Sequence, residues 1–283
     1  MRRRVWCETL PFAELTHPYV TELVARYHLD LLLAVRPWQI AEVGDVVRHF
    51  QGAGVFVALW PMLADEDGRW ASASSARAFI AFTDELLRVV PFAEELAIDL
   101  EPPLHLLARW KSGDPTWRQT PLPHTYRQAR DSLIAAVARW RVDRRITTAV
   151  LPLLALEWRG QWLQRILGTP ATVLDVDRHS VMAYTSLYEG WSRGLVNRAR
   201  AERLFAITAR MTHARFGAKA ALSLGTVGAG AFGDEIGYRD PRELSRDVAL
   251  ARAAGIEELA LFDLGGVIRR APAEGWLDAF VCD

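Results

Sequence analysis

The sequence predicts a closed barrel of eight parallel strands and eight helices, a single-domain α/β fold of the (β/α)8 or TIM barrel class. Apolar runs of strand length alternate with stretches of helical period along the whole chain. The chain has 283 residues, close to the roughly 250 residues that such a barrel needs. No glycine-rich phosphate loop of the dinucleotide-binding type follows the first strand, which disfavours a doubly wound open sheet.

The first half of the chain supplies four strands with helices between them. Apolar runs that end at polar or turn-forming residues predict the strands, and amphipathic stretches predict the helices. We expect strands at 4–10, 29–35, 55–59 and 96–101, and helices at 17–27, 40–51 and 72–90. Gly52 and Gly54 are expected to end the second helix, because glycine readily adopts the left-handed conformation found there.

A segment rich in proline and tryptophan interrupts this alternation at about 104–124, after the fourth strand. We expect it to be an insertion within one barrel domain that covers residues 1–283. The second half of the chain then continues the pattern. We expect strands at 146–152, 180–185, 220–224 and 259–262, and helices at 126–141, 160–166, 197–216, 241–254 and 275–280.

The charge and composition of the chain exclude several classes of partner. Its 34 basic and 34 acidic residues give a formal net charge of zero, so no basic field attracts nucleic acid or an anionic membrane. Two cysteines provide neither a disulfide framework nor a multi-cysteine zinc site, and we predict no metal and no cofactor. Lys111 and Lys219 are the only lysines, a skew towards arginine that is typical of GC-rich bacterial genomes. The oligomeric state is not predicted.

The N-terminus gives no convincing targeting signal. The basic start Met1-Arg2-Arg3-Arg4 is followed by a mixed polar segment, whereas a secretory signal continues as an apolar stretch. No run of eighteen apolar residues predicts a membrane span. As the sequence stands we expect a cytoplasmic protein, and secretion stays open if a leader was trimmed.

The predicted fourth strand ends in two carboxylates, Asp99 and Glu101, followed by two prolines. Side chains alternate along a strand, so the two acids point to the same face. Like charges at short range and partial burial both raise the pKa of a carboxyl group. A carboxyl with a raised pKa can donate a proton near neutral pH, so this strand end is a candidate acid catalyst.

In a barrel of this kind the active site lies at the carboxyl ends of the strands. Acids, an arginine and aromatic residues occupy those ends in this sequence. Flat aromatic rings stack on the C–H faces of sugars, and charged groups bind their hydroxyls, so we predict a carbohydrate site. The expected substrate-binding residues are Glu8, Arg36, Trp60, Met182, Phe262 and Asp263, with Trp38 and Trp191 as weaker candidates for the same groove.

Two segments carry a resemblance to a known family. The pattern Glu94-x-x-Ala97-x-Asp99-x-Glu101 resembles the Asp-x-x-Asp-x-Asp-x-Glu signature on strand four of the chitinase-like barrels, glycoside hydrolase family 18. Met182-Ala183-Tyr184-Thr185 is similar to the Met-x-Tyr-Asp segment on strand six of that family. The resemblance implies that Glu101 protonates the glycosidic oxygen. It also implies that Asp99 orients the 2-acetamido group of the substrate and that Tyr184 hydrogen-bonds this group.

The sequence departs from the family pattern at several positions. Ala97 stands where the family has a third acid, Thr185 where an Asp follows the tyrosine, and Phe262 near the place of a strand-eight tryptophan. An ordinary pair of carboxylates therefore stays open as an alternative mechanism. A second carboxylate about 5 Å from the acid would predict retention, and one at about 6.5–9.5 Å would predict inversion. Glu8 and Asp263 are the candidates that lie closest to strand ends.

The sequence therefore predicts a glycosidase that cleaves a glycan, with N-acetylglucosamine as one candidate component. Two alternatives stay open. A non-catalytic carbohydrate-binding barrel would use the same aromatic residues. A metal-dependent sugar-processing barrel would need several histidines or acids on separate strands, and of the seven histidines only His105 is near Glu101 in the sequence.

Overall fold

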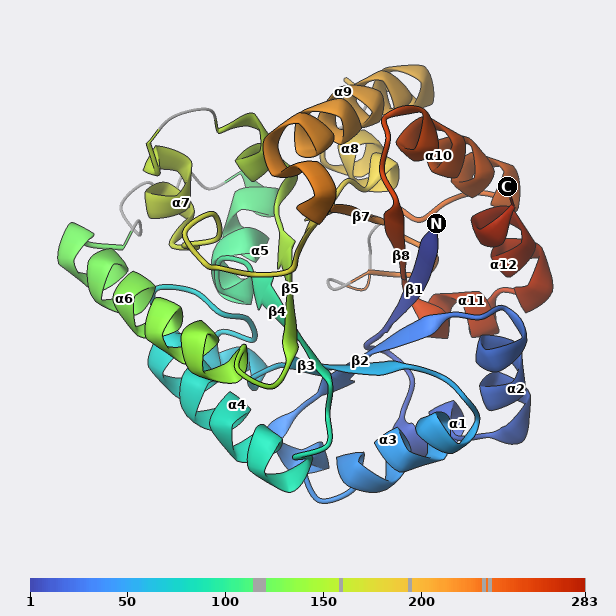
Figure 1. The fold of residues 1–283 in the computed structure, drawn as a ribbon. Coiled ribbons are helices and arrows are strands. Elements are labelled where there is room, and N and C mark those ends of the chain that lie inside the picture. The colour runs from blue at the N-terminus through green and yellow to red at the C-terminus, as the bar shows by residue number, and fades with distance from the viewer. Residues whose placement is uncertain (114–120, 158–159, 193–194, 231–232, 234–235, 283) are drawn as a thin grey trace. The chain divides into compact units, whose positions relative to one another are not determined.

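The fold is a closed barrel of eight strands, each hydrogen-bonded to its neighbours in the order of the sequence from β1 to β8 (Figure 1). The computed structural model describes residues 1–113, 121–157, 160–192, 195–230, 233 and 236–282. Strand β1 pairs in parallel with β2 and β8, β4 with β3 and β5, and β7 with β8. This confirms the predicted (β/α)8 barrel.

The strands are β1 (Arg2–Cys7), β2 (Asp30–Val35), β3 (Val57–Pro61), β4 (Glu95–Leu100), β5 (Arg145–Val150), β6 (Arg178–Met182), β7 (Ala220–Gly225) and β8 (Glu258–Phe262). The helices are α1 (Phe12–Leu15), α2 (Pro18–Arg26), α3 (Val43–Gly52), α4 (Ala76–Val89), α5 (Leu104–Ser112), α6 (Pro123–Trp140), α7 (Trp162–Leu167), α8 (Thr185–Trp191), α9 (Arg198–Phe216), α10 (Pro241–Ala253), α11 (Leu264–Arg269) and α12 (Ala273–Val281). None of the helices in the described ranges is long and apolar enough to cross a membrane.

Two expectations about element boundaries were wrong. The strand expected at 180–185 ends at Met182, because Thr185 begins α8 and Tyr184 is the N-cap residue of this helix. The first strand covers Arg2–Cys7 where 4–10 was expected. Arg4 can lie buried in this strand because an acid neutralises it. Arg4 Nη1 lies 3.1 Å from Glu258 Oε1 on the neighbouring strand β8.

The segment at 104–124 contains more helix than the sequence indicated. Its first part forms α5, which begins directly after the two prolines and ends at Gly113 in the left-handed conformation. Residues 114–120 lie outside the described residues. The following helix begins at Pro123, three residues before the expected start, since proline is well suited to the first turn of a helix.

The chain divides into two compact units, each with its own buried interior. We name them the terminal unit, at 1–33, 45–57 and 180–283, and the central unit, at 34–44 and 58–179. The terminal unit contains β1, β7 and β8, and its helices are in contact in the order α8, α9, α10 and α12. The central unit contains β4 and β5, with α4 in contact with α6. The expectation of one domain stays a prediction.

Strand β4 lies at the centre of the packing in the central unit. All of its six residues are buried, and six consecutive residues pair with β5, from Glu95 opposite Arg145 to Leu100 opposite Val150. Parallel strands that are buried on both faces read as nearly continuous apolar runs. A charged residue in such a strand, as Asp99 is, therefore needs a specific reason to be there.

The interior of the terminal unit combines apolar packing with a short chain of hydrogen bonds. The buried indole of Trp6 donates from Nε1 to Ser223 Oγ at 2.9 Å. Ser223 Oγ in turn lies 2.8 Å from Ser180 Oγ. These contacts join β1, β7 and β6, and they satisfy polar atoms whose burial would otherwise cost free energy.

Candidate active site

The central unit places two carboxylate side chains at the carboxyl end of β4. Asp99 is the penultimate residue of the strand and its side chain is buried, with the residue only 3% exposed. Glu101 follows the strand directly and is half-buried. The Asp99 carbonyl accepts a hydrogen bond of 2.9 Å from the backbone N–H of Ala71, which ties the strand end to the segment after β3. At this strand end a buried acid, Asp99, is therefore followed two residues later by a partly accessible acid, Glu101.

The segment after β3 is held by a cluster of three charged side chains. Asp65 accepts hydrogen bonds from Arg69 at Nε and Nη2, both at 2.7 Å, and from Arg36 Nη1 at 3.1 Å. Arg36 Nη1 also donates to the carbonyl of Leu63. The hydrogen bonds from Arg69 hold the pKa of Asp65 below its ordinary value. Arg36, predicted to bind substrate, thus has a structural contact with this segment.

Two tryptophans of the central unit differ sharply in exposure. Trp60, in β3, is 2% exposed, so little of its ring is open to a ligand. Trp38 follows β2 in a short 3-10 helix and is 66% exposed. The guanidinium carbon of Arg36 lies 5.8 Å from the centroid of the Trp38 ring. Of these two rings, Trp38 presents the larger free face for stacking.

In the terminal unit, Tyr184 and Phe262 form a stacked aromatic pair. Their ring centroids are 6.0 Å apart with an interplanar angle of 28°, and both residues are buried. Gly225, at the end of β7, makes room for this pair. A Cβ atom at this position would lie 3.2 Å from Tyr184 Cδ1 and 3.2 Å from the carbonyl oxygen of Phe262. The pair therefore depends on a glycine in the neighbouring strand.

Replacing Gly225 by alanine is expected to destabilise the protein by about 1–3 kcal/mol, the usual cost of adding a methyl group to a filled core. The measurement is urea-induced unfolding followed by circular dichroism. Gly52→Ala is the matched control, because a Cβ at Gly52 would meet no atom within 4 Å. Equal stability of the two variants would show that the Tyr184 ring has room to shift.

Asp263 has a structural role that the sequence did not predict. Its Oδ1 accepts from the backbone N–H of Gly266 at 2.8 Å and so caps the start of α11. Its Oδ2 accepts from the backbone N–H of Thr9 at 3.2 Å and from Thr9 Oγ1 at 2.9 Å. Asp263 thereby connects the end of β8 to the segment after β1. Glu8 follows β1 directly and is half-buried.

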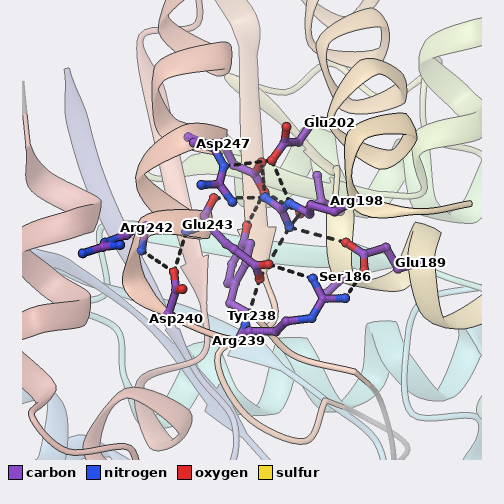
Figure 2. Close-up of polar contacts among 12 residues, drawn as sticks. Ser186, Glu189, Arg198, Glu202, Tyr238, Arg239, Asp240, Arg242, Glu243 and Asp247 are labelled. Atoms are coloured by element: carbon purple, nitrogen blue, oxygen red, sulfur yellow. Dashed lines mark hydrogen bonds and ion pairs between the residues drawn. The ribbon is translucent and has the colours of Figure 1, made fainter.

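A network of charged side chains connects α8, α9 and α10 in the terminal unit (Figure 2). At its centre, Asp247 of α10 is fully buried. It accepts three hydrogen bonds, from Thr185 Oγ1 at 2.5 Å, Tyr238 Oη at 2.8 Å and Arg198 Nη2 at 2.8 Å. Burial raises the pKa of Asp247 from its ordinary value of 3.8 to about 6. Because Thr185 directly follows Tyr184, the network fixes the backbone that carries this tyrosine.

Further acids surround the Arg198 guanidinium and extend the network outwards (Figure 2). Glu202 Oε1 lies 2.9 Å from Arg198 Nε, and it also pairs with Arg246 at 2.9 Å. Glu189 and Glu243 each lie 3.9 Å from Arg198 Nη1. Helices α8, α9 and α10 are therefore connected through one arginine. The sequence carried a signal for this network, since Arg198 and Glu202 have the four-residue spacing of a helical ion pair.

The predicted site residues fall into two sets. The central unit has Arg36, Trp60, Asp99 and Glu101, and the terminal unit has Glu8, Met182, Tyr184, Phe262 and Asp263. Within the central set, Asp99 and Glu101 share one strand end. Within the terminal set, Tyr184 and Phe262 are in contact. The expectation that both sets line one mouth stays a prediction.

Comparison with known proteins shows the same fold in several carbohydrate-active proteins. No family model and no curated protein matches the chain. The PgaB (BpsB) glycoside hydrolase domain from Bordetella bronchiseptica is similar with a TM-score of 0.60 at 12% identity, over 100% of this chain and 99% of that one. A family GH18 chitinase from Cycas revoluta gives 0.53 at 13% identity, over 99% and 100%.

A third similar structure is a D-psicose 3-epimerase, with a TM-score of 0.53 at 12% identity over 99% of this chain and 96% of that chain. Identities this low establish the barrel fold and no more. The same fold serves many unrelated reactions, so activity has to be argued from the residues of the site.

Proposed function

We propose that this protein is a glycoside hydrolase in which Glu101 is the general acid. The observation that carries the proposal is the Asp99-x-Glu101 pair at the carboxyl end of β4, with Asp99 buried and Glu101 partly accessible. Strand ends of this polarity carry the catalytic groups in (β/α)8 barrels. Glycosidases need a carboxylic acid that protonates the leaving oxygen, and Glu101 has the accessibility for this step.

Asp99 supports Glu101 through its charge. A buried carboxylate two residues away in the sequence disfavours a second negative charge beside it. A general acid has to carry its proton before the substrate binds, and we assign Asp99 this supporting role. In the step itself, the proton of Glu101 passes to the glycosidic oxygen as the bond from this oxygen to the anomeric carbon breaks. The oxygen of a water molecule then bonds to the anomeric carbon, and the proton that this water loses returns to the Glu101 carboxylate.

The comparisons favour N-acetylglucosamine as a component of the glycan. The Cycas revoluta chitinase was determined with allosamidin and with (GlcNAc)3 bound. If this chain acts similarly, Asp99 orients the 2-acetamido group, and the hydrogen bond from Tyr184, which belongs to the other unit, stays a prediction. Thr185 stands where the family pattern has an Asp, and its hydroxyl donates to Asp247 inside the buried network. Because no acid follows Tyr184 in this chain, we expect Asp99 to be the carboxylate that orients the acetamido group.

The first experiment is a hydrolysis assay of the wild-type protein on chitooligosaccharides, β-glucans, α-glucans and xylans, with new reducing ends as the readout. The proposal expects turnover of at least one class, and of chitooligosaccharides if the acetamido group takes part. Binding of a glycan without release of reducing ends on any of them would contradict the hydrolase and favour a carbohydrate-binding barrel.

Asp99→Asn is expected to lower kcat by about 10²–10³-fold, the size of effect found when one electrostatic contact to a transition state is removed. Asparagine keeps the shape of the buried side chain and loses its charge. The measurement is initial-rate kinetics on the best substrate of the panel. Asp143→Asn, at an exposed residue of the same unit, is the control. Unchanged kinetics in Asp99→Asn would exclude a role of this charge in catalysis.

A further inference from the structure

The central unit contains a cavity of about 600 Å³ whose lining is rich in arginine. Helix α6, helix α7 and the segment before β6 surround it, and in Figure 1 α7 lies beside the end at which α6 begins. The polar lining side chains are Tyr126, Arg127, Arg130, Gln161, Arg165 and Thr172. None of the residues assigned to catalysis lines this cavity, so a ligand bound here would be distinct from the substrate of the proposed active site.

The three arginines place more positive charge on the cavity than the nearby acids balance. Arg127 and Arg130 are three residues apart on α6 and therefore share one face of the helix. Arg165 faces the same cavity from α7. Within the described part of the chain, Arg130 pairs with the exposed Asp131 at 2.8 Å, whereas Arg127 and Arg165 form no ion pair with any carboxylate. Arg165 Nε donates to the carbonyl of Gln161 at 3.3 Å, which leaves its charge unbalanced. Three cationic side chains on one cavity favour an anionic occupant.

The nearby acid Glu157 already forms hydrogen bonds within the protein. Glu157 is buried, and it accepts hydrogen bonds from the backbone N–H of Leu163 at 2.8 Å and from Gln164 Nε2 at 2.6 Å. Its carboxylate therefore stabilises the first turn of α7. Burial, and secondarily the charge of Glu157, raise the pKa of Tyr126 to about 12. The Tyr126 hydroxyl is neutral near pH 7, as an ordinary tyrosine is, and the raised pKa extends this neutrality to more alkaline pH.

Neutral polar groups complete the lining. Tyr126 Oη donates to Gln161 Oε1 at 3.3 Å. Thr172 Oγ1 accepts from Gln164 Nε2 at 2.8 Å, and as a hydroxyl it also has a proton to donate. In addition, the eighteen-residue helix α6 begins at Pro123, which lines the same cavity. The positive end of its dipole adds to the attraction that the arginines exert on an anion.

We propose that this cavity binds an acidic saccharide through its carboxylate or phosphate group. Arginine forms paired, charge-assisted hydrogen bonds with these two anions, which share the required oxygen geometry. The neutral groups of Tyr126, Gln161 and Thr172 suit the hydroxyls of a sugar ring. The volume is within the range of about 300–1,000 Å³ typical of small-molecule sites. The proposal is independent of the hydrolase assignment.

The test is isothermal titration calorimetry of the full chain with glucuronate, glucose 6-phosphate, inorganic phosphate and glucose. We expect the acidic sugars to bind at least about tenfold more tightly than glucose, the difference expected from one good charged hydrogen bond. Equal affinity for glucose and glucuronate, or no binding of any probe, would overturn the proposal. Inorganic phosphate that binds as tightly as glucose 6-phosphate would overturn the saccharide assignment.

The double variant Arg127→Gln/Arg165→Gln should lower the affinity for glucuronate by at least about tenfold. Both side chains are exposed, so we expect the fold to be retained, with circular dichroism as the check. Arg210→Gln on α9 is the matched control, since it removes an exposed arginine that does not line the cavity. Unchanged affinity in the double variant would contradict the proposed site. Activity on the glycan panel is expected to be the same in all three proteins.

Discussion

Replacing Glu101 by glutamine is expected to lower the rate of glycan hydrolysis by about 10²–10⁴-fold, the usual contribution of a general acid, while binding of the glycan is retained. An amide has nearly the shape of a carboxyl group and can still form hydrogen bonds to a sugar. It has no acidic proton to transfer to the leaving oxygen. Loss of turnover with retained binding would therefore identify proton donation as the role of Glu101.

The kinetics can separate proton donation from a general disturbance of the site. An aryl glycoside with an acidic phenol as leaving group needs little protonation, so Glu101→Gln should lose much less activity on it than on an oligosaccharide. Glu85→Gln, at an exposed residue of α4, is the matched control and should hydrolyse both substrates normally. An equal loss of activity on both substrates would contradict the assignment of Glu101 as the acid.

Asp247→Ala is expected to lower the free energy of unfolding by about 3–5 kcal/mol, the cost of removing one partner from a buried ion pair. The change removes the acceptor of three hydrogen bonds, from Thr185, Tyr238 and Arg198. It also leaves the Arg198 guanidinium with only its more distant or more exposed acids. Chemical denaturation at pH 7 measures the effect.

The control for this variant is Arg246→Gln, which breaks only the half-exposed pair with Glu202. We expect it to cost less than about 1 kcal/mol, because exposed ion pairs contribute little. If both variants lost the same small amount, the buried network would contribute no more to stability than a surface ion pair.

The raised pKa of Asp247 gives stability a specific dependence on pH. In the folded protein this carboxyl has a pKa of about 6, against an ordinary value of 3.8. Between these two values the folded state binds the proton more tightly than the unfolded state does. The contribution of Asp247 to the unfolding free energy therefore falls as pH rises from about 4 to about 6, and it is level above that range. Asp247→Ala should lack this component when stability is measured across the same pH range.

The barrel and its acidic strand end could be predicted from the sequence because both depend on local pattern. Strand β4 combines alternating side chains with a proline stop, and the observed strand ends within one residue of the expected position. The end of β6 could not be predicted in this way. The run from Val181 to Tyr184 continues to read as a strand, whereas the chain turns into α8 at Thr185. The contact that fixes this turn, from Thr185 to Asp247, joins residues 62 positions apart.

The contacts of several charged residues could not be predicted from the sequence either. Arg4 was expected at the start of the first strand with no partner assigned, and it is buried against Glu258, which lies 254 positions away. Arg127 and Arg165 look like ordinary surface charges on two helices. Only the fold places them on one cavity. A sequence pattern reports which face of an element is apolar, but it does not report which distant element supplies the opposite charge.

The most direct test of the central claim is a crystal structure of the Glu101→Gln variant with an oligosaccharide that the wild-type protein cleaves. We expect a glycosidic oxygen within about 2.6–3.2 Å of the amide at position 101, the distance needed for proton transfer in the native protein. An oligosaccharide bound with no glycosidic oxygen near the end of β4 would contradict the assignment of this strand end as the catalytic site.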